Sequence, residues 1–425
     1  MASDDISVHE DSDATACDVA VVGGGLAGAT LGLALAQEGF LAAIVDAVDP
    51  ATMRAASFDG RTTALAYATA RMFRRLGLWE AIAPHAEPIR DILVTDGALK
   101  SPSTRGGVSE SRLHFDGRDL EGESVLGWIV ENRILRNALF DAVTSAEGVS
   151  LIAPARSVDA AFKGGRATLK LDNGRDVTGS LIVAADGKRS PLAARAGIRA
   201  LRWGYGQKGI VVTVSHERPH EGVAQEYFLP GGPFAILPMT EDRCSLVWTE
   251  RDDLADAYMA LDDDAFLEAI SDRFGEYLGD LRLAGPRSSF PLSFHFSERF
   301  AAPRLALAGD AARAIHPIAG QGFNLGLKDV AALVDVLVDA RGLGRDIGDI
   351  GVLGEYDRWR RFDSTALAFG TDALNRLFSN DIAPIRAARR IGLSAVNAIR
   401  PLKKTFMRES GADLGRLPRL LQPGV

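Results

Sequence analysis

The stretch DVAVVGGGLAG, residues 18–28, decides the fold of this 425-residue chain. Its first five residues form a short apolar, β-branched run, which predicts a buried parallel strand. Gly23, Gly25 and Gly28 follow with G-x-G-x-x-G spacing, and residues 29–37, rich in Ala and Leu, predict a helix. Gly23 permits a tight turn, Gly25 lets the backbone approach a pyrophosphate, and Gly28 lets helix and strand pack closely.

A second strand and an acidic residue complete this motif. The apolar run LAAIV (41–45) ends at Asp46, which lies 18 residues after Gly28, about where an acid meets a ribose hydroxyl. A carboxylate there repels a 2′-phosphate, so the site is expected to hold an unphosphorylated adenosine. Glycines alone could form a structural turn. Strand, glycines, helix, strand and acid in this order predict a dinucleotide-binding domain whose helix N-terminus faces the phosphates.

The second decisive stretch is RLALAGDAARAIHPIAGQGFNLGLKD, residues 304–329. An apolar run ends at Gly309-Asp310, a loop with Pro and Gly follows, and then a segment that predicts a helix. A bound flavin needs a carboxylate at a strand end for its ribityl hydroxyls and a helix N-terminus aimed at its ring. Together with the early glycine motif, this stretch predicts that the chain folds back on itself around a flavin dinucleotide.

A third motif lies between these two. Residues 167–171 and 176–185 predict a hairpin whose turn holds Asn173-Gly174. The second half runs into SLIVAA, which ends at Asp186-Gly187. Asp-Gly after a strand is by itself more typical of a plain turn.

The organisation predicted from these motifs is an α/β chain with a discontinuous nucleotide domain. Residues 17–85, 123–200 and 297–350 form a Rossmann-like FAD-binding domain; residues 86–122 and 201–296 form an inserted, mostly antiparallel β-sheet substrate domain; residues 351–425 form a C-terminal helical region. Residues 1–16 hold five acidic residues and no Lys or Arg, so we interpret them as a disordered acidic tail and not as a secretory signal.

Composition indicates a globular cytoplasmic protein. Hydrophobic residues make up 47% and charged residues 24% of the chain, and the net charge of −8 gives no sign of nucleic-acid binding. Cys17 and Cys244 are too few and too far apart for a disulfide framework, which fits a reducing compartment. Residues 16–36 are apolar enough to resemble a signal or membrane segment, but their glycines argue against it. No other stretch reaches the roughly 18 uncharged apolar residues of a spanning helix.

Taken together, the three motifs resemble the fingerprints of single-component flavin monooxygenases of the aromatic-hydroxylase type. More closely, the chain resembles the ubiquinone-biosynthesis hydroxylase family of FAD-dependent aromatic monooxygenases over residues 17–425. The motifs that carry this resemblance are DGRTTALA (59–66), LGLW (76–79), VENRILRNAL (130–139), GDAARAIHPIAGQGFNLG (309–326), TDALNRLFSN (371–380) and LPRLL (417–421).

The resemblance implies a para-hydroxybenzoate hydroxylase-like fold, FAD as cofactor and NAD(P)H as a transient co-substrate. It implies hydroxylation of the ring of a polyprenyl phenol in ubiquinone biosynthesis, with molecular oxygen and through a flavin C4a-hydroperoxide. Two alternatives stay open: a hydroxylase of another aromatic substrate, and a non-catalytic, flavin-bound member of a complex with other quinone-biosynthesis proteins.

The resemblance also implies roles for particular residues. The ADP part of FAD would be held by Gly23, Gly25, Gly28 and Asp46. The pyrophosphate and the path of the nicotinamide would lie near Asp186 and Gly187, and the ribityl chain would be bound by Asp310. The isoalloxazine would lie along Pro317, Gly320, Gln321, Gly322 and Asn324. Arg61 and Arg133 would lie near the pyrophosphate or flavin, or else form surface ion pairs. The chain departs from the family at Arg313, where His is usual, and at Ala193, where Arg is usual.

No catalytic side chain or metal site is assigned. We interpret His316 as a structural loop histidine. His216 and His220 have helical spacing, but Pro219 between them argues against a helical metal site. Candidates for the substrate pocket, each of which could equally be core, are Tyr227, Phe228, Phe234, Pro238 and Trp248.

The sequence of the C-terminal region predicts one helix from Pro384 to Pro401, with a basic face that continues to Arg408. This face could be an ordinary solvated surface. The alternative is peripheral contact of residues 384–408 with the inner face of the cytoplasmic membrane, where a prenylated quinone precursor resides.

Overall fold

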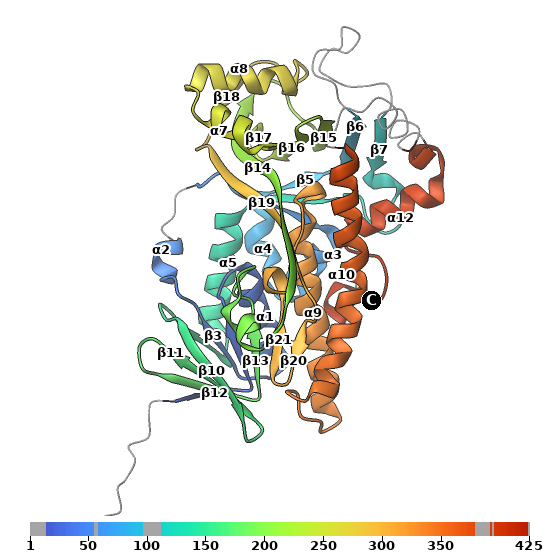
Figure 1. The fold of residues 1–425 in the computed structure, drawn as a ribbon. Coiled ribbons are helices and arrows are strands. Elements are labelled where there is room, and N and C mark those ends of the chain that lie inside the picture. Colours follow the sequence, from blue (N-terminus) through green and yellow to red (C-terminus); the bar gives the residue numbers. More distant parts are fainter. Residues whose placement is uncertain (1–13, 55–57, 97–111, 379–391, 393–394, 424–425) are drawn as a thin grey trace, which may run out of the picture.

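The structure is a computed structural model that describes residues 14–54, 58–96, 112–378, 392 and 395–423 (Figure 1). A nucleotide-domain sheet lies at the centre of the molecule in the view of Figure 1, and a long twisted sheet rises from it to a helical cap formed by α7 and α8. The long helix α10 (Ile350–Phe378) runs along one side.

The central sheet has six strands and carries the glycine motif. Its order is β20 (Ala301–Ala302), β21 (Leu305–Leu307), β13 (Leu181–Ala184), β2 (Val19–Val22), β3 (Ala42–Val45) and β9 (Val149–Ile152). All of these strands are parallel to their neighbours except β20. Every residue of β2, β3, β13 and β21 is buried, which explains their continuous apolar runs.

Helices cover this sheet and connect its strands. Helix α1 (Leu26–Gln37) packs against α9 (Gln321–Gly342) and α5 (Asn132–Ser145), and α9 packs against α10. The remaining helices of this region are α2 (Pro50–Arg54), α3 (Tyr67–Arg75), α4 (Trp79–Ile82), α6 (Pro191–Arg195) and the short 3-10 segments η1 (Ala83–His85), η3 (Gly309–Ala311) and η4 (Ile318–Gly320). The α/β, Rossmann-like class predicted from the sequence is confirmed.

The second large sheet takes strands from both predicted insertions and one short strand, β22 (Arg313–Ala314), from the segment before α9. Its order is β22, β19 (Ser288–Ser297), β14 (Ala200–His216), β17 (Arg243–Arg251), β16 (Gly232–Met239), β15 (Val223–Leu229), β6 (Asp91–Asp96) and β7 (Arg112–Asp116), with β18 (Leu281–Leu283) also on β14. Among these described strands, only the β15–β6 pair is parallel. Helices α7 (Asp252–Met259) and α8 (Asp263–Phe274) cover its outer face over a core of their own.

Two smaller sheets complete the fold. Strands β4 (Thr62–Ala66), β8 (Gly127–Glu131) and β5 (Ala86–Ile89) form one, and β1 (Thr15–Ala16), β12 (Asp176–Gly179), β11 (Arg166–Leu171) and β10 (Ser157–Lys163) form the other. The hairpin predicted around Asn173-Gly174 is β11–β12. Thr15 and Ala16, assigned to the tail from the sequence, instead pair with Val177 and Thr178 of β12. Residues 1–13 lie outside the described part.

The C-terminal segment returns to the flavin-domain helices. The single helix predicted for Pro384–Pro401 is wrong at its end, because the backbone at Ile399 is extended and a separate helix, α12 (Arg400–Ser410), begins after it. Residues 384–391 lie outside the described part. After α12 and the turn η5 (Arg419–Leu421), Arg71 of α3 donates to the Leu421 carbonyl and Lys328 of α9 to the Leu414 carbonyl.

Candidate functional site

Four neighbouring parallel strands end at one edge of the central sheet, and each is followed by one of the sequence motifs. In spatial order, Gly309-Asp310 follows β21, Asp186-Gly187 follows β13, the glycine loop follows β2, and Asp46 follows β3. In open α/β sheets, ligands bind outside the carboxyl ends of the strands. Motifs that lie far apart in the sequence therefore meet at one site.

The three glycines of the loop do different things. A β-carbon on Gly23 would lie 2.4 Å from the carbonyl oxygen of Ala185, and one on Gly28 would lie 1.8 Å from that of Gly23. Gly23 also has φ of +104°. A β-carbon on Gly25 would meet no atom within 4 Å. Gly23 and Gly28 are thus required for packing, whereas Gly25 leaves open space where a pyrophosphate would approach.

Two helices begin at this edge without a side-chain cap. Helix α1 starts after Gly25 and α9 after Gly320, and neither has an acidic residue in its first turn. A β-carbon on Gly322, at the start of α9, would also meet no atom within 4 Å. Uncapped N–H groups and the positive end of the helix dipole favour anions. These residues fit a flavin dinucleotide, whose pyrophosphate would lie at the start of α1 and whose ring would lie at the start of α9.

Asp46 lies directly beside the glycine loop. Its carboxylate accepts a hydrogen bond from the Gly24 N–H at 2.5 Å and another from the Val48 N–H at 2.7 Å. These bonds fix the orientation of Asp46 and still leave lone pairs for a ribose hydroxyl.

The other two carboxylates face different surroundings. Asp310 is exposed at the strand end, yet nearby protein atoms displace enough water to raise its pKa, an effect that Lys188 and Arg313 oppose. Burial also raises the pKa of Asp186, whose Oδ1 has no hydrogen-bond partner among the described residues. An unpaired buried oxygen is costly in a protein, so Asp186 fits a position that a ligand completes.

Arg61 and Arg133, named from the resemblance, lie in local ion pairs. Arg61 contacts Asp59 at 2.6 Å and its side chain is 51% exposed. Arg133 contacts Glu131 at 2.5 Å and its side chain is 40% exposed. In this structure both guanidinium groups are bound to carboxylates two residues away.

Arg136, in the same motif as Arg133, was not singled out from the sequence. It lines an open pocket of about 510 Å³ next to Gly24 and Gly25. Its side chain is 18% exposed, and its Nη2 lies 3.4 Å from Asp59 Oδ2. Its buried Nε has no partner among the described residues. Spacing on α5 could have found it, because Arg133 and Arg136 lie on neighbouring parts of one helical face.

The loop residues before α9 serve partly as structure. Gly320 has φ of +62°, and a β-carbon there would lie 3.0 Å from that of Ala64. Asn324 is 2% exposed; its oxygen accepts from the Ala66 N–H and its nitrogen donates to the Ala64 carbonyl. The Asn324 side chain thus ties α9 to β4. Gln321 donates to the Ser410 carbonyl at 3.1 Å, and Pro317 is half-buried.

The proposed pocket residues divide between the two faces of the nine-stranded sheet. Tyr227, Phe234 and Trp248 belong to the core beneath α7 and α8, on the outer face. Phe228 belongs to the main core on the inner face. Pro238 is buried and lies four residues after Phe234 on β16, so it faces the same outer side of the sheet as Phe234. Tyr227, Phe234 and Trp248 are therefore core residues. The sequence could not show this, since alternation along a strand does not reveal which face a second layer of helices covers.

His316, interpreted from the sequence as a structural loop histidine, is buried behind the loop. His316 is 0% exposed and stands edge-on to Tyr205, with ring centroids 5.1 Å apart. Asp372 of α10 accepts a hydrogen bond from the Trp203 indole at 3.2 Å. Burial lowers the pKa of His316 to about 4, against the opposing effect of Asp372, and neither ring nitrogen has a partner among the described residues.

The two departures from the family have clear positions. Ala193 is buried in α6 and its N–H binds the Ser190 hydroxyl, whereas Arg195 donates to the Val158 carbonyl. Arg313 is 3% exposed and contacts Asp329 of α9.

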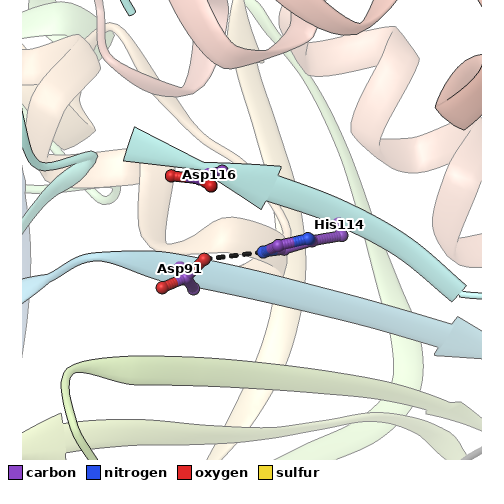
Figure 2. Close-up of side chains that lie close together, drawn as sticks. All are labelled: Asp91, His114 and Asp116. Carbon is purple, nitrogen blue, oxygen red and sulfur yellow. Dashed lines mark hydrogen bonds and ion pairs between the residues drawn. The ribbon is translucent and has the colours of Figure 1, made fainter. Parts of the chain in front are cut away.

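One cluster in the described part of the chain has metal-ligand geometry. Atoms of Asp91, His114 and Asp116 lie within 4.8 Å of one another on β6 and β7 (Figure 2). His114 Nε2 lies 2.6 Å from Asp91 Oδ1, and Arg118 binds both oxygens of Asp116. These bonds lower the pKa of Asp116 to about 2. Since the Arg118 guanidinium already binds the Asp116 carboxylate, we interpret this cluster as a network of ion pairs and hydrogen bonds.

The basic residues of α12 bind acidic residues of the chain itself. Lys403 contacts Asp119 of η2 (Gly117–Asp119) at 2.9 Å, and Lys404 contacts Glu121 at 3.0 Å. The outward apolar side chains of this region are Ile399, Leu402 and Phe406, which are 50%, 38% and 43% exposed. None of the helices in the described ranges is long and apolar enough to span a membrane.

Comparison with known proteins adds to this geometry. Residues 16–346 match the model of a family described as FAD binding domain. The chain is 44% identical over 410 residues to ubiquinone hydroxylase UbiL of Rhodospirillum rubrum, covering 96% of this chain and 93% of the relative. It is 32% identical over 393 residues to 3-demethoxyubiquinol 3-hydroxylase of Escherichia coli, covering 92% and 97%.

Solved structures share the fold at low identity. The p-nitrophenol 4-monooxygenase PnpA of Pseudomonas putida superimposes with a TM-score of 0.79 at 17% identity, covering 95% of this chain and all of the other. A single-residue variant of HpxO from Klebsiella pneumoniae, complexed with FAD, superimposes with a TM-score of 0.71 at 18% identity, covering 93% and 99%.

Proposed function

Because the chain belongs to the FAD-binding family that contains the ubiquinone hydroxylases, and is itself an FAD-dependent monooxygenase, we propose that it hydroxylates the aromatic ring of a polyprenyl phenol in ubiquinone biosynthesis. NAD(P)H is the reductant and molecular oxygen the second substrate. Bound FAD supplies the redox and oxygen chemistry, and the protein supplies binding, orientation and exclusion of water.

The observation that carries the proposal is the meeting of four motifs at one edge of the central sheet. Gly25 and the start of α1 would hold the pyrophosphate, and Asp46 the ribose. Asp310 would bind the ribityl hydroxyls. The uncapped start of α9 would stabilise negative charge on the ring, because its N–H groups point toward that side.

The substrate would lie between the flavin and the inner face of the nine-stranded sheet. Tyr205 on β14 is half-buried there and borders the loop that precedes α9. Its neighbours Trp203 and Phe294 stack with centroids 4.0 Å apart. Such aromatic side chains suit a phenol ring, and the protein has to place that ring close to the reacting oxygen.

The test uses purified protein with bound FAD and a set of phenols that differ in prenyl length and ring substitution. We expect NAD(P)H oxidation to rise when the correct prenyl phenol is added, and the product to gain the mass of one oxygen atom. Oxidation with release of hydrogen peroxide but without hydroxylated product, for every prenyl phenol tried, would contradict the proposed substrate class.

Two alternatives give different results in this assay. A hydroxylase of another aromatic substrate would respond to phenols without a prenyl chain. A non-catalytic, flavin-bound member of a quinone-biosynthesis complex would bind FAD yet show no stimulation by any phenol. Deletion of the gene in its host, followed by mass analysis of the accumulated quinone precursor, would then identify the blocked step.

Peripheral contact with an anionic membrane is the second part of the proposal. Leu402 and Phe406 project from α12, and exposed Arg400 begins the helix two residues before Leu402, an arrangement that suits an interfacial helix. We expect stronger sedimentation with anionic than with neutral liposomes. Replacing both apolar residues by Ser should abolish that binding, whereas Leu343→Ser, at a residue 73% exposed on another loop, should preserve it. Equal partitioning into both liposomes would contradict membrane contact.

A further inference from the structure

Asp329, on the third turn of α9, is a buried carboxylate that binds the turn at Gly309 directly. It is 0% exposed, and its Oδ2 accepts a hydrogen bond from the Gly309 N–H at 3.1 Å. Gly309 immediately precedes Asp310. A single side chain on the helix therefore fixes the backbone next to the carboxylate that would bind the ribityl chain.

Two arginines bind the two oxygens of this carboxylate. Arg313 Nη1 contacts Asp329 Oδ2 at 2.5 Å, and Arg360 Nε of α10 contacts Oδ1 at 2.9 Å. All three side chains are buried. Such a group is stable only when its charges and hydrogen bonds match closely. An amide at position 329 could not accept from all three donors, since its nitrogen would face a guanidinium.

The packing around Gly309 leaves little freedom for the turn. Its φ is +61°, and a β-carbon on Gly326 of α9 would lie 3.2 Å from the Gly309 α-carbon. The helix thus lies directly against the turn, and the bond from Asp329 sets the direction in which the chain leaves β21. The charge of Arg313 also reaches Asp310, where it opposes the rise in pKa that burial causes.

We propose that Asp329 is a positioning residue for FAD, which acts through the Gly309 N–H to aim Asp310, and that Arg313 and Arg360 hold Asp329 in place. Arg313 therefore faces the helix behind the turn. This inference concerns binding of the cofactor and does not depend on which phenol is hydroxylated.

The test compares two carboxylates on the same helix. Asp335 also lies on α9, is 8% exposed and accepts hydrogen bonds from Arg419, but it has no hydrogen bond to the Gly309 turn. The FAD dissociation constant of deflavinated Asp329→Asn and Asp335→Asn proteins is measured by quenching of flavin fluorescence. Thermal unfolding of each apoprotein is measured in parallel.

We expect Asp329→Asn to raise the FAD dissociation constant at least tenfold and Asp335→Asn to change it less than twofold. A dissociation constant for Asp329→Asn within twofold of wild type would overturn the proposal, whatever the loss in unfolding temperature. If Asp329→Asn does not fold, Arg313→Lys replaces it, because Lys keeps the charge but not the guanidinium geometry. That variant should bind FAD at least threefold more weakly, and unchanged affinity would count against Asp329.

None of these measurements uses a phenol or NAD(P)H. A wild-type protein that binds FAD but fails to hydroxylate any prenyl phenol would contradict the proposed function and leave this inference standing. Loss of FAD affinity in Asp335→Asn equal to that in Asp329→Asn would contradict the inference alone.

Discussion

Gly28 lies so close to Gly23 that a β-carbon on Gly28 would be 1.8 Å from the Gly23 carbonyl oxygen. Gly25, three residues before Gly28, would place its β-carbon in open space. The same added methyl group should therefore have opposite effects at the two positions. Gly28→Ala should destabilise the apoprotein by about 2 kcal/mol or more, because overpacking against backbone cannot relax easily. Gly25→Ala should leave apoprotein stability within about 0.5 kcal/mol, as open sites usually do.

For FAD affinity we expect the opposite order, with Gly25→Ala affected more than Gly28→Ala. Gly25→Ala should weaken FAD binding by about tenfold or more, which corresponds to about 1.4 kcal/mol, because its methyl group occupies the space of the pyrophosphate. Urea unfolding of the apoproteins and FAD titrations of both variants provide the measurement. Normal FAD affinity in Gly25→Ala would show that the pyrophosphate does not approach this loop.

The second prediction concerns the two arginines of the VENRILRNAL motif. Arg136 lines the pocket beside Gly24; its Nη2 lies 3.4 Å from Asp59, and its buried Nε has no partner among the described residues. Arg133 is 40% exposed and bound to Glu131 at 2.5 Å. Arg136→Met should therefore raise the FAD dissociation constant about tenfold, in the range expected for one charge-assisted contact. Arg133→Met is the matched control and should change it less than threefold. The reverse order would restore the role that the family resemblance assigns to Arg133.

The nucleotide domain could be predicted from sequence because its signals are local. The glycine spacing, the apolar run of β2 and Asp46 all lie within residues 18–46, and backbone geometry alone dictates the glycines. Gly309-Asp310 and Asp186-Gly187 were also found, since each follows a fully buried strand. Most strands of the nine-stranded sheet could be predicted as two insertions because alternation and turn residues mark them, whereas β22, only two residues long, carries no such signal.

Contacts between distant segments could not be predicted in the same way. Tyr227 and Phe228 are adjacent in sequence, yet α7 and α8 cover one of them and the main core covers the other. The sequence shows that they face opposite sides of the sheet without showing which side receives a helix. The Asp329–Arg360 pair likewise depends on how α9 and α10 cross, which no local pattern encodes.

The third prediction tests whether Asn324 is a structural residue. Its side chain makes hydrogen bonds to Ala66, Thr69, Ala64 and Gly320, so its removal leaves several buried groups unpaired. Asn324→Ala should lower the free energy of unfolding of the apoprotein by about 2–4 kcal/mol, measured in urea. Thr69→Val removes one of these bonds and should cost about 1 kcal/mol. A loss below about 1 kcal/mol in Asn324→Ala would argue that its amide serves the cofactor instead.

The fourth prediction concerns pH and the buried His316. Burial lowers its pKa from 6.5 to about 4 in the folded protein. A group with a depressed folded pKa stabilises the fold fully above its unfolded pKa, and that contribution is lost as pH falls from about 6.5 toward about 4. Between pH 7.5 and pH 5.0, His316 should therefore cost about 2 kcal/mol of stability, since each unit of pKa difference is worth about 1.4 kcal/mol.

His316→Asn, which does not titrate, should unfold in urea with a pH dependence about 2 kcal/mol smaller than wild type over this interval. His85→Asn, at an exposed histidine in η1, is the control and should keep the wild-type slope. If His316→Asn keeps that slope too, the pKa of His316 is not lowered in the fold, and the charge of Asp372 would then offset the effect of burial.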